Sequence, residues 1–518
     1  MHGKASPVAP GDNDSASGTV QATDLEKNLQ KDNSTEVDSQ ERDHRDSDVE
    51  VDVFEVTLDP SDDPQAQSGR KKWIQVLTIC TAASCVTCFS SVAGFTQPAI
   101  QQTFHISPTV SILPISLFVA GLGCGPLLLA PLSEFFGRAM IYRVSYTAFC
   151  VLGVPVALAR DPATHLVFRF IQGFAGAAFL SVAGGSVTDL FQDYNVALPM
   201  AVYTSSPFLG PVLGPLISGF VNQNLDWRWT YYVMLIWAAV ELVGLFLLVP
   251  ESSTPVLRKW KAIRLRGTTK DERYFAPLER SGKSVRAAVW ASCTVPFRIL
   301  MHETMALLLD IWSALVLGVL YLTFQAFPYI FASAPPIGHG FSVQLTGLTF
   351  LGLGVGMVLA LATQPFWIAL HARKVKEYNG QPPPEVRLYI GMAGAVLFPL
   401  GLFWLAFTTY TSVHPLVPIF AGIPIGMGTI YIFTTSFTFL VTAYRPYAAS
   451  AMAGNSFVRS AFAAAFPLFA GPMYRALGSV GATALLAGLA TLMSPIPFIF
   501  YRIGPRLRAR SKFTMTAE

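Results

Sequence analysis

The stretch "GPLLLAPLSEFFGRAMIY", residues 125–142, places two charges in a short turn between long apolar runs. Glu134 precedes Arg138 by four residues, and Gly137 lies between them. Apolar runs of about 20 residues are long enough to cross the hydrocarbon core of a bilayer as helices. Glycine permits the backbone conformations of a tight turn. The stretch therefore predicts two membrane-spanning helices joined by a short charged turn.

The composition of the whole chain agrees with a membrane protein. Of 518 residues, 52% are hydrophobic and 13% are charged, whereas soluble proteins carry about 25% charged residues. More than half of the 32 acidic residues lie within the first 69 positions. That segment is too polar to bury enough surface to offset its chain entropy. We expect residues 1–70 to form a disordered acidic tail.

The body of the chain alternates apolar runs with short polar connections. Twelve runs are long enough to span a bilayer, at about 73–97, 109–131, 139–159, 164–189, 197–221, 229–249, 305–330, 343–370, 388–409, 415–441, 447–474 and 477–501. They predict an all-α membrane protein with two six-helix bundles, at 71–250 and 304–502. Repeated halves are typical of transporters, with the binding site between them. The count alone would also fit a channel or a membrane enzyme.

Basic residues predict the orientation of the chain. The connections on the side of the tail hold eleven Lys or Arg between residues 251 and 300 and the C-terminal run "RIGPRLRARSK". The opposite connections hold only Arg160, Arg228 and Arg475. Basic loops favour the cytoplasmic side. We therefore expect the basic central loop, 251–303, and the basic tail, 503–518, to be cytoplasmic with the N-terminus.

Several motifs resemble one family. The turn at 125–142 resembles the loop signature of the major facilitator superfamily, although Ala130 replaces an early glycine. The runs "FRFIQGFAGA" (168–177) and "SPFLGPVLGPLISGF" (206–220) resemble its fourth- and fifth-span signatures. Residues 70–510 are similar to the fungal twelve-span drug:proton antiporters, which include multidrug and secondary-metabolite exporters. The resemblance implies the major facilitator fold.

The resemblance also implies a gating latch at the opening turn. Glu134 and Arg138, with Gly137 between them, would pair with each other or with charges and helix ends of the next bundle when the cytoplasmic side is closed. A contact made in only one state shifts the populations of the two states. The alternative is that Arg138 only sets the topology.

Intramembrane charges are the candidates for proton coupling. The family signature gives Arg169 and Gln172 this role, with both facing the cavity, unless Arg169 reaches the outer surface. The acids Glu241, near the middle of the sixth span, and Asp310, two turns into the seventh, are chosen by placement alone. A buried acid is suited to binding and releasing protons. Either acid can instead be a helix residue without a coupling role.

The fifth span carries an antiporter signature of small and kinked positions. Glycines four residues apart lie on one helix face and let another helix approach closely, while prolines bend the span. Such an interface would suit two rocking halves, although ordinary helix packing gives the same spacing. The signature comprises Gly210, Pro211, Gly214, Pro215 and Gly219.

The substrate cavity is predicted from polar and aromatic residues of the second half. Arg459 lies near the middle of the eleventh span, where it can pair with Asp310 or Glu241, bind an anionic substrate, or serve structure alone. Asn455 lies one turn earlier. Phe327 and Tyr431 would contribute to an apolar cavity wall, although core packing explains aromatic residues equally well.

These observations predict a proton-coupled transporter that exports a small amphipathic molecule, such as a toxin, a drug or a secondary metabolite, across the plasma membrane by alternating access. The alternatives are an organic-anion transporter and, more remotely, a non-transporting membrane receptor. No glycine-rich loop ending in Lys and Ser or Thr is present, so we expect no nucleotide cofactor and take the proton gradient as the energy source. We also expect no metal and no enzyme activity. The expected partners are cargo, protons and membrane lipids, without nucleic acid, and the chain is expected to be a monomer.

Overall fold

The computed structural model describes residues 54–192, 195–280, 284–335, 337–379, 382–509 and 511. The first 55 residues and residues 56–518 are separate units. Most of the predicted acidic tail and the end of the predicted basic tail therefore lie outside the described residues. The described part of the second unit is built from helices and the turns that join them.

The first half of the unit consists of helices in a nearly continuous series. After a short helix η1 (Pro64–Ala66), they are α2 (Gly69–Phe104), α3 (Pro108–Cys124), α4 (Pro126–Phe136), α5 (Arg138–Ala157), α6 (Pro162–Gly176), α7 (Ala178–Ser181), α8 (Ala183–Leu190), α9 (Ala197–Asn224) and α10 (Trp227–Leu248). Several begin at proline, whose fixed φ suits the first turn of a helix and whose missing N–H costs nothing there.

A connector and a second half complete the unit. The connector holds α11 (Thr254–Thr269), α12 (Pro277–Arg280) and α13 (Val285–His302). The second half holds α14 (Thr304–Phe327), η2 (Pro328–Ala332), α15 (Val343–Leu348), α16 (Leu351–Ala362), α17 (Gln364–Glu377), η3 (Pro384–Arg387), α18 (Leu388–Thr408), α19 (Leu416–Phe420), α20 (Gly422–Ala443), η4 (Arg445–Tyr447), α21 (Ala448–Met493) and α22 (Ile496–Arg508).

The described helices account for twelve membrane spans. Ten stretches are individually long and apolar enough, and α3 with α4, bent by 41°, make an eleventh. The last stretch, Ala448–Arg508, has 61 residues, which as one helix would be about three times the thickness of the hydrocarbon core. Gly478 interrupts it with a φ of 70°. This stretch is therefore two spans, and the prediction of an all-α twelve-span protein is confirmed.

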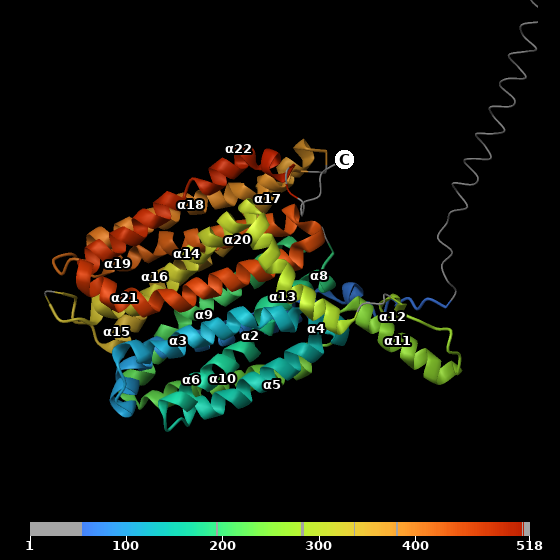
Figure 1. The fold of residues 1–518 in the computed structure, drawn as a ribbon, viewed down its shortest axis with the longest axis horizontal. Coiled ribbons are helices and arrows are strands. Elements are labelled where there is room, and N and C mark those ends of the chain that lie inside the picture. Colours follow the sequence, from blue (N-terminus) through green and yellow to red (C-terminus); the bar gives the residue numbers. More distant parts are fainter. Residues whose placement is uncertain are drawn as a thin grey trace, which may run out of the picture. The chain divides into compact units, whose positions relative to one another are not determined.

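The two ends of the bundle differ in what they carry. We call the end where α2 begins the tail end and the end where α2 finishes the far end. Figure 1 shows α11 and α12 beside α4 and α8 at the tail end, on the right, while α15 and α19 lie at the far end, on the left. The segment 251–303, predicted as a loop, is thus largely helical, and α13 packs against both α4 and α21. Helix α22 also continues beyond the predicted end of the last span.

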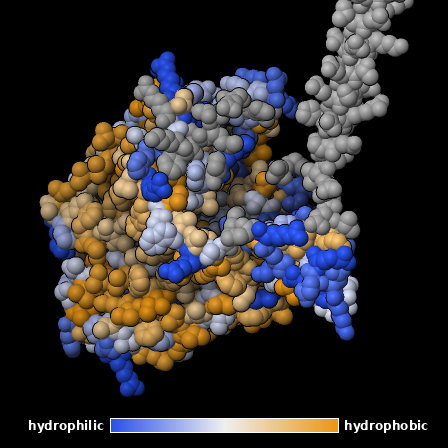
Figure 2. Space-filling model, turned by 45° about the vertical axis from the view of Figure 1, so that its right-hand side comes forward, coloured by the Kyte–Doolittle hydropathy of each residue, from blue (hydrophilic) through white to orange (hydrophobic). Residues whose placement is uncertain are grey.

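The bundle turns apolar side chains outward. Leu247 in α10 is 76% exposed and Val240 is 66% exposed, which in water would be unfavourable. Figure 2 shows a broad hydrophobic surface over the helices, with the hydrophilic residues gathered toward its edges. Such a belt matches the hydrocarbon core of a bilayer. Integral membrane placement follows from the surface as well as from helix length.

Buried apolar residues form two main clusters. One holds residues of the first half between Ile79 and Val249. The other holds the second half and also takes in residues of α2, α3 and α9, among them Phe95, Ile115 and Val212. The second core therefore extends across the interface between the halves.

The glycines of the fifth-span motif lie at two different contacts. A Cβ on Gly210 would meet Thr87, and one on Gly214 would meet Ser91, so this part of α9 packs on α2 within its own half. Gly219 instead lies against Val343 and Gly347 of α15, in the other half. The predicted contact between rocking halves therefore involves Gly219 at the far end, while Gly210 and Gly214 hold the first half together.

This packing predicts the effect of one added methyl group. Gly214→Ala forces α2 and α9 apart, so we expect it to lower the stability of the purified protein by about 1–3 kcal/mol, the usual cost of overpacking. Gly488→Ala in α21 is the matched control, because no atom lies within 4 Å of its added Cβ. Thermal unfolding followed by size-exclusion chromatography measures both. Equal stability of the two variants would contradict the close packing of α2 on α9.

Candidate functional site

The turn between α4 and α5 is held by a glutamate from a distant part of the chain. Gly137 has a φ of 98°, a conformation that side chains disfavour, and a Cβ there would meet the carboxylate of Glu251. That carboxylate accepts hydrogen bonds from the backbone N–H of Arg138 at 2.8 Å and of Ala139 at 3.1 Å. It also accepts from Ser253 at 2.9 Å. Glu251 thus caps the N-terminus of α5 with a negative charge.

The side chain of Arg138 has a partner other than the predicted one. Its Nε lies 3.3 Å from Oδ2 of Asp189 in α8, and its Nη1 donates to Ser133 Oγ at 2.7 Å. Glu134 points to solvent, and within the described residues Arg138 does not pair with it. The predicted pairing of Glu134 with Arg138 is therefore wrong for this conformation. These side-chain partners of Arg138 belong to the first half, rather than to the next bundle.

Arg169 is enclosed by backbone rather than by acids. Its side chain is fully buried, with Nη2 donating to the carbonyl of Phe89 at 2.9 Å and Nε to that of Pro114 at 3.1 Å. The guanidinium lies 4.3 Å from the centre of the Phe118 ring. Gln172, also buried, donates to the carbonyl of Phe149 at 3.4 Å. Both side chains cross-link helices inside the first half, which differs from the prediction that they face the cavity.

Glu241 lies on the outer side of the first half. It accepts from the indole N–H of Trp237 at 3.0 Å and from the hydroxyl of Thr81 at 3.2 Å. Its neighbour Val240 faces the lipid. The partners of Glu241 thus belong to its own half, and the predicted pairing with Arg459 is not made.

The other predicted acid, Asp310, joins the predicted cavity residues. Asn455 of α21 donates through Nδ2 to Asp310 Oδ1 at 2.8 Å and to Ser313 Oγ at 2.9 Å. Asp310 and Asn455 are both buried. Arg459 follows Asn455 by one helical turn, which places it on the same face of α21. Asp310 and Asn455 thus meet, whereas the ion pair between Arg459 and Asp310, one of the predicted alternatives, is not made among the described residues.

Arg459 lies among aromatic rings at the interface of the halves. Its guanidinium is 4.8 Å from the centre of the Phe437 ring and 5.3 Å from that of Phe433. Phe433 stacks on Phe208 of α9, in the other half, at 4.2 Å. The Nε of Arg459 is buried without a hydrogen-bond partner among the described residues. Arg459 therefore offers a donor that the described part of the protein does not use.

The predicted aromatic wall has a different position. Phe327 is buried against Phe350, the residue just before α16, with ring centres 4.6 Å apart. Tyr431 is buried too, and its hydroxyl lies 2.6 Å from that of Thr363. Phe327 belongs to the packing between helices rather than to an open cavity, so this assignment is wrong. Phe433 and Phe437, aromatic residues of the same predicted span as Tyr431, do lie beside Arg459.

Known proteins with similar sequences decide the family. Residues 79–467 match the sequence profile of the Major Facilitator Superfamily. The chain belongs to the major facilitator superfamily. It is 45% identical over 460 residues to "Efflux pump atB" of Aspergillus terreus, covering 88% of this chain and 95% of that protein. It is 38% identical to "Probable drug/proton antiporter YHK8" of Saccharomyces cerevisiae, covering 90% of each.

A solved structure supports the same fold. The proton:xylose symporter XylE, a major facilitator protein, superposes with a TM-score of 0.57 at 16% sequence identity, covering 84% of this chain and 96% of that one. At this identity the likeness concerns the fold alone.

Two residues of this major facilitator protein were missed or underrated from the sequence. Glu251 follows the sixth span in "VPESS", and an acid at a membrane edge that is otherwise basic is a signal that could have been noticed. Asp189 lies at the end of α8, and nothing in the sequence links it to Arg138. No sequence pattern joins Glu251 to residue 138, because 113 positions separate them.

The two glutamates near the turn allow a matched test. Glu251→Gln removes the charge from four charge-assisted hydrogen bonds, so we expect a loss of about 1–3 kcal/mol in stability. Glu134→Gln, at an exposed position of the same turn, should be neutral. Thermal unfolding of both purified variants measures the difference. A neutral Glu251→Gln would show that the cap does not stabilise α5.

Proposed function

We propose that this chain is a proton-coupled exporter of small amphipathic molecules that works by alternating access. The observation that carries the proposal is the cluster of Asp310, Asn455 and Arg459, an acid, an amide and a cation inside the second half. Arg459 lies beside Phe433, which stacks on Phe208 of the first half. Polar groups in this position are costly and in transporters mark the path of substrate or protons. The names of the two relatives, an efflux pump and a drug/proton antiporter, support the direction of transport and its coupling.

The placement in the cell follows from the distribution of charge. Basic residues are concentrated at the tail end, in the connector and after the last span. The positive-inside tendency supports a cytoplasmic tail end with both termini inside. We further propose a monomer in the plasma membrane that requires no nucleotide and performs no enzyme reaction.

The motion would open and close the contacts between halves. At the far end, a Cβ on Gly347 of α15 would lie 2.5 Å from the carbonyl of Pro215 in α9, so the helices touch backbone to backbone. The hydroxyls of Ser90 and Tyr321, also from opposite halves, lie 2.7 Å apart. Opening toward the far end must break these contacts. Both states must be populated during transport. The open state therefore has to replace these contacts with interactions of similar free energy, because a free-energy difference between the states would favour one of them.

In this proposal Asp310 carries the proton and Arg459 responds to it. A deprotonated Asp310 would attract the Arg459 guanidinium, whereas a protonated Asp310 would release it toward cargo. Asn455 holds Asp310 in place in either case. Arg169 and Gln172 cross-link helices of the first half, which keeps that half rigid during transport. The Arg138–Asp189 pair stabilises the turn at the tail end and is the gating element.

Substituting each of the two intramembrane acids tests which of them couples transport to protons and which is only structural. In proteoliposomes with an imposed pH gradient, Asp310→Asn should lose gradient-driven export while keeping exchange of labelled against unlabelled cargo. Glu241→Gln is the control, because its partners lie on the lipid side of the first half, and it should retain both activities. Export by the native protein that survives a protonophore would overturn proton coupling, and gradient-driven export by Asp310→Asn would overturn the assignment of the acid.

A second candidate function is transport of an organic anion. The unpartnered Nε of Arg459 favours it, since a buried donor without a partner among the described residues is suited to a carboxylate. With Arg459→Gln, binding of an anionic cargo should weaken by about 1.5–3 kcal/mol, and binding of a neutral cargo should change little. Isothermal titration of each cargo class against native and variant protein makes this comparison. Undiminished anion binding by the variant would remove this candidate.

A further inference from the structure

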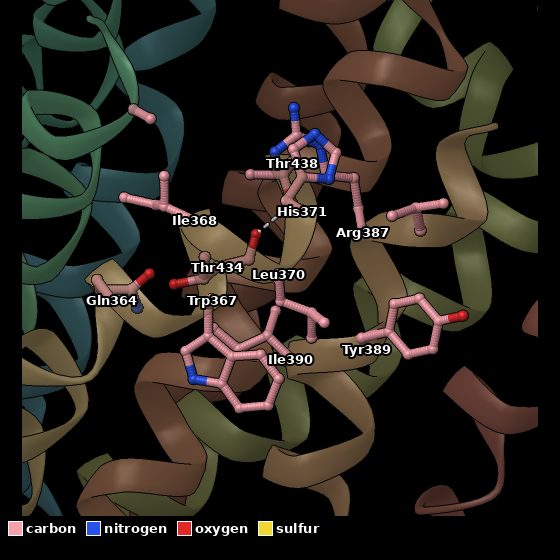
Figure 3. A pocket seen from close by; sticks show the side chains of 12 residues that line it. Gln364, Trp367, Ile368, Leu370, His371, Arg387, Tyr389, Ile390, Thr434 and Thr438 are labelled. Atoms are coloured by element: carbon pink, nitrogen blue, oxygen red, sulfur yellow. Dashed lines mark hydrogen bonds between the residues drawn. The ribbon is translucent and has the colours of Figure 1, made fainter. Parts of the chain in front are cut away.

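A second group of polar side chains lies away from the Asp310 cluster. At the tail end, a cleft of about 90 Å³ opens between α17, η3, α18, α20 and the start of α9. A single buried water needs roughly 10–15 Å³ on this measure, so the cleft has room for a small polar group. Figure 3 shows the side chains that line it, with the nitrogen-bearing ends of His371 and Arg387 at one end and the indole ring of Trp367 at the other. The cleft thus has a cationic end and an aromatic end.

The wall of the cleft carries hydrogen-bond donors that the protein does not use. Within the described residues, Gln364 Nε2, Trp367 Nε1 and His371 Nδ1 are buried atoms without a partner. Gln364 is 3% exposed, so water has little access to its amide. Buried donors without partners cost free energy and are uncommon in folded proteins. Two such donors, from Gln364 and Trp367, beside the unpartnered imidazole nitrogen of His371, indicate that a ligand on this wall supplies the missing hydrogen-bond partners.

The charges of the wall identify the kind of acceptor. Arg387 is the positive charge among the described residues that line the cleft, and no acid is among them. The nearest acid in sequence, Glu385, is already held by Arg508 at 2.9 Å and 3.0 Å. Within the described residues no carboxylate pairs with Arg387. The cationic end is therefore suited to a carboxylate or a phosphate.

The opposite end is suited to an apolar body. Trp367, Leu370 and Ile390 supply its wall. Phe366, beside Trp367, is 64% exposed, so this end of the cleft borders the surface that faces lipid. A ligand can therefore reach it along the membrane.

We propose that this cleft binds the acidic group of an amphipathic anion, at a site separate from the Asp310 cluster. Arg387 and His371 hold the carboxylate or phosphate, Gln364 and Trp367 donate hydrogen bonds, and the apolar wall contacts the rest of the molecule. Two sources share this chemistry, namely the headgroup of an acidic membrane lipid and a soluble aromatic acid. The site does not depend on the proposed export, because its occupancy is a binding property of the resting protein.

The experiment uses the full chain in phosphatidylcholine nanodiscs and two probes. Equilibrium dialysis measures the binding of 2-naphthoate, with the neutral 2-naphthalenemethanol as reference. Native mass spectrometry of protein taken from mixed nanodiscs measures the retention of phosphatidylserine. Arg387→Gln should weaken binding of the acidic probe by about 10- to 100-fold, while Arg387→Lys, which keeps the charge, should recover most of it.

Arg373→Gln is the matched control, because Arg373 is exposed on α17 and does not line the cleft. It should leave the binding of both probes unaffected. Melting temperatures establish whether the variants are folded. If Arg387→Gln does not fold, His371→Gln provides a second test. Retention of phosphatidylserine without binding of naphthoate assigns the lipid headgroup as the source, and the reverse assigns a soluble acid.

Two results would overturn the site. One is an equal loss of acidic-probe binding in Arg373→Gln and Arg387→Gln, which would mean that the probe is attracted diffusely to a basic surface. The other is binding of neither acid above its neutral reference. Because neither readout involves transport, failure of this site is distinguishable from failure of the proposed export.

Discussion

A buried charge inside a bilayer is costly unless the protein surrounds it with hydrogen-bond partners or aromatic rings, and this constraint shapes where the chain keeps its few ionisable groups. Arg169 takes its partners from the backbone carbonyls of two other helices. Asp310 takes an amide from α21. Glu251 takes four backbone N–H groups at the membrane edge. Each charge therefore joins helices that the sequence separates, and the same groups that make the fold specific mark the places where it can function.

Local chemistry made much of the fold predictable from the sequence. Length and apolar composition locate the spans, because a helix that crosses hydrocarbon must satisfy its own backbone. The glycine and proline positions of "SPFLGPVLGPLISGF" predicted a close helix contact, and Gly210 and Gly214 make one with α2. The sequence could not say which helix would be the partner, because a glycine face fits any helix that can approach it. The connector was predicted as a loop because its basic residues were used only to assign its side of the membrane. In the structure, its helix α13 packs against both halves.

The candidate site was predictable where residues share one helix. Asn455 and Arg459 are one turn apart, so their common face follows from helix geometry. The scarcity of buried acids also suggested that Arg459 pairs with Asp310 or Glu241, but Asp310 accepts its hydrogen bond from Asn455 instead. Phe327 was misplaced because aromatic content does not reveal whether a ring faces a cavity or another helix. The donors of the second cleft come from α17 and η3, and no spacing rule joins them before the chain is folded.

Gly478 is one of several very short connections at the far end of the bundle. The last two spans reverse direction around this residue with hardly any connecting loop, and the connections at Phe104–Pro108, Ala157–Pro162 and Asn224–Trp227 are nearly as short. Apart from the longer connections at 333–342 and 409–415, the far end therefore exposes little for an antibody, a protease or a glycosyltransferase to recognise. The opposite end, with α11 to α13, offers most of the water-facing surface, so this protein can be handled, tagged or regulated from one side far more readily than from the other.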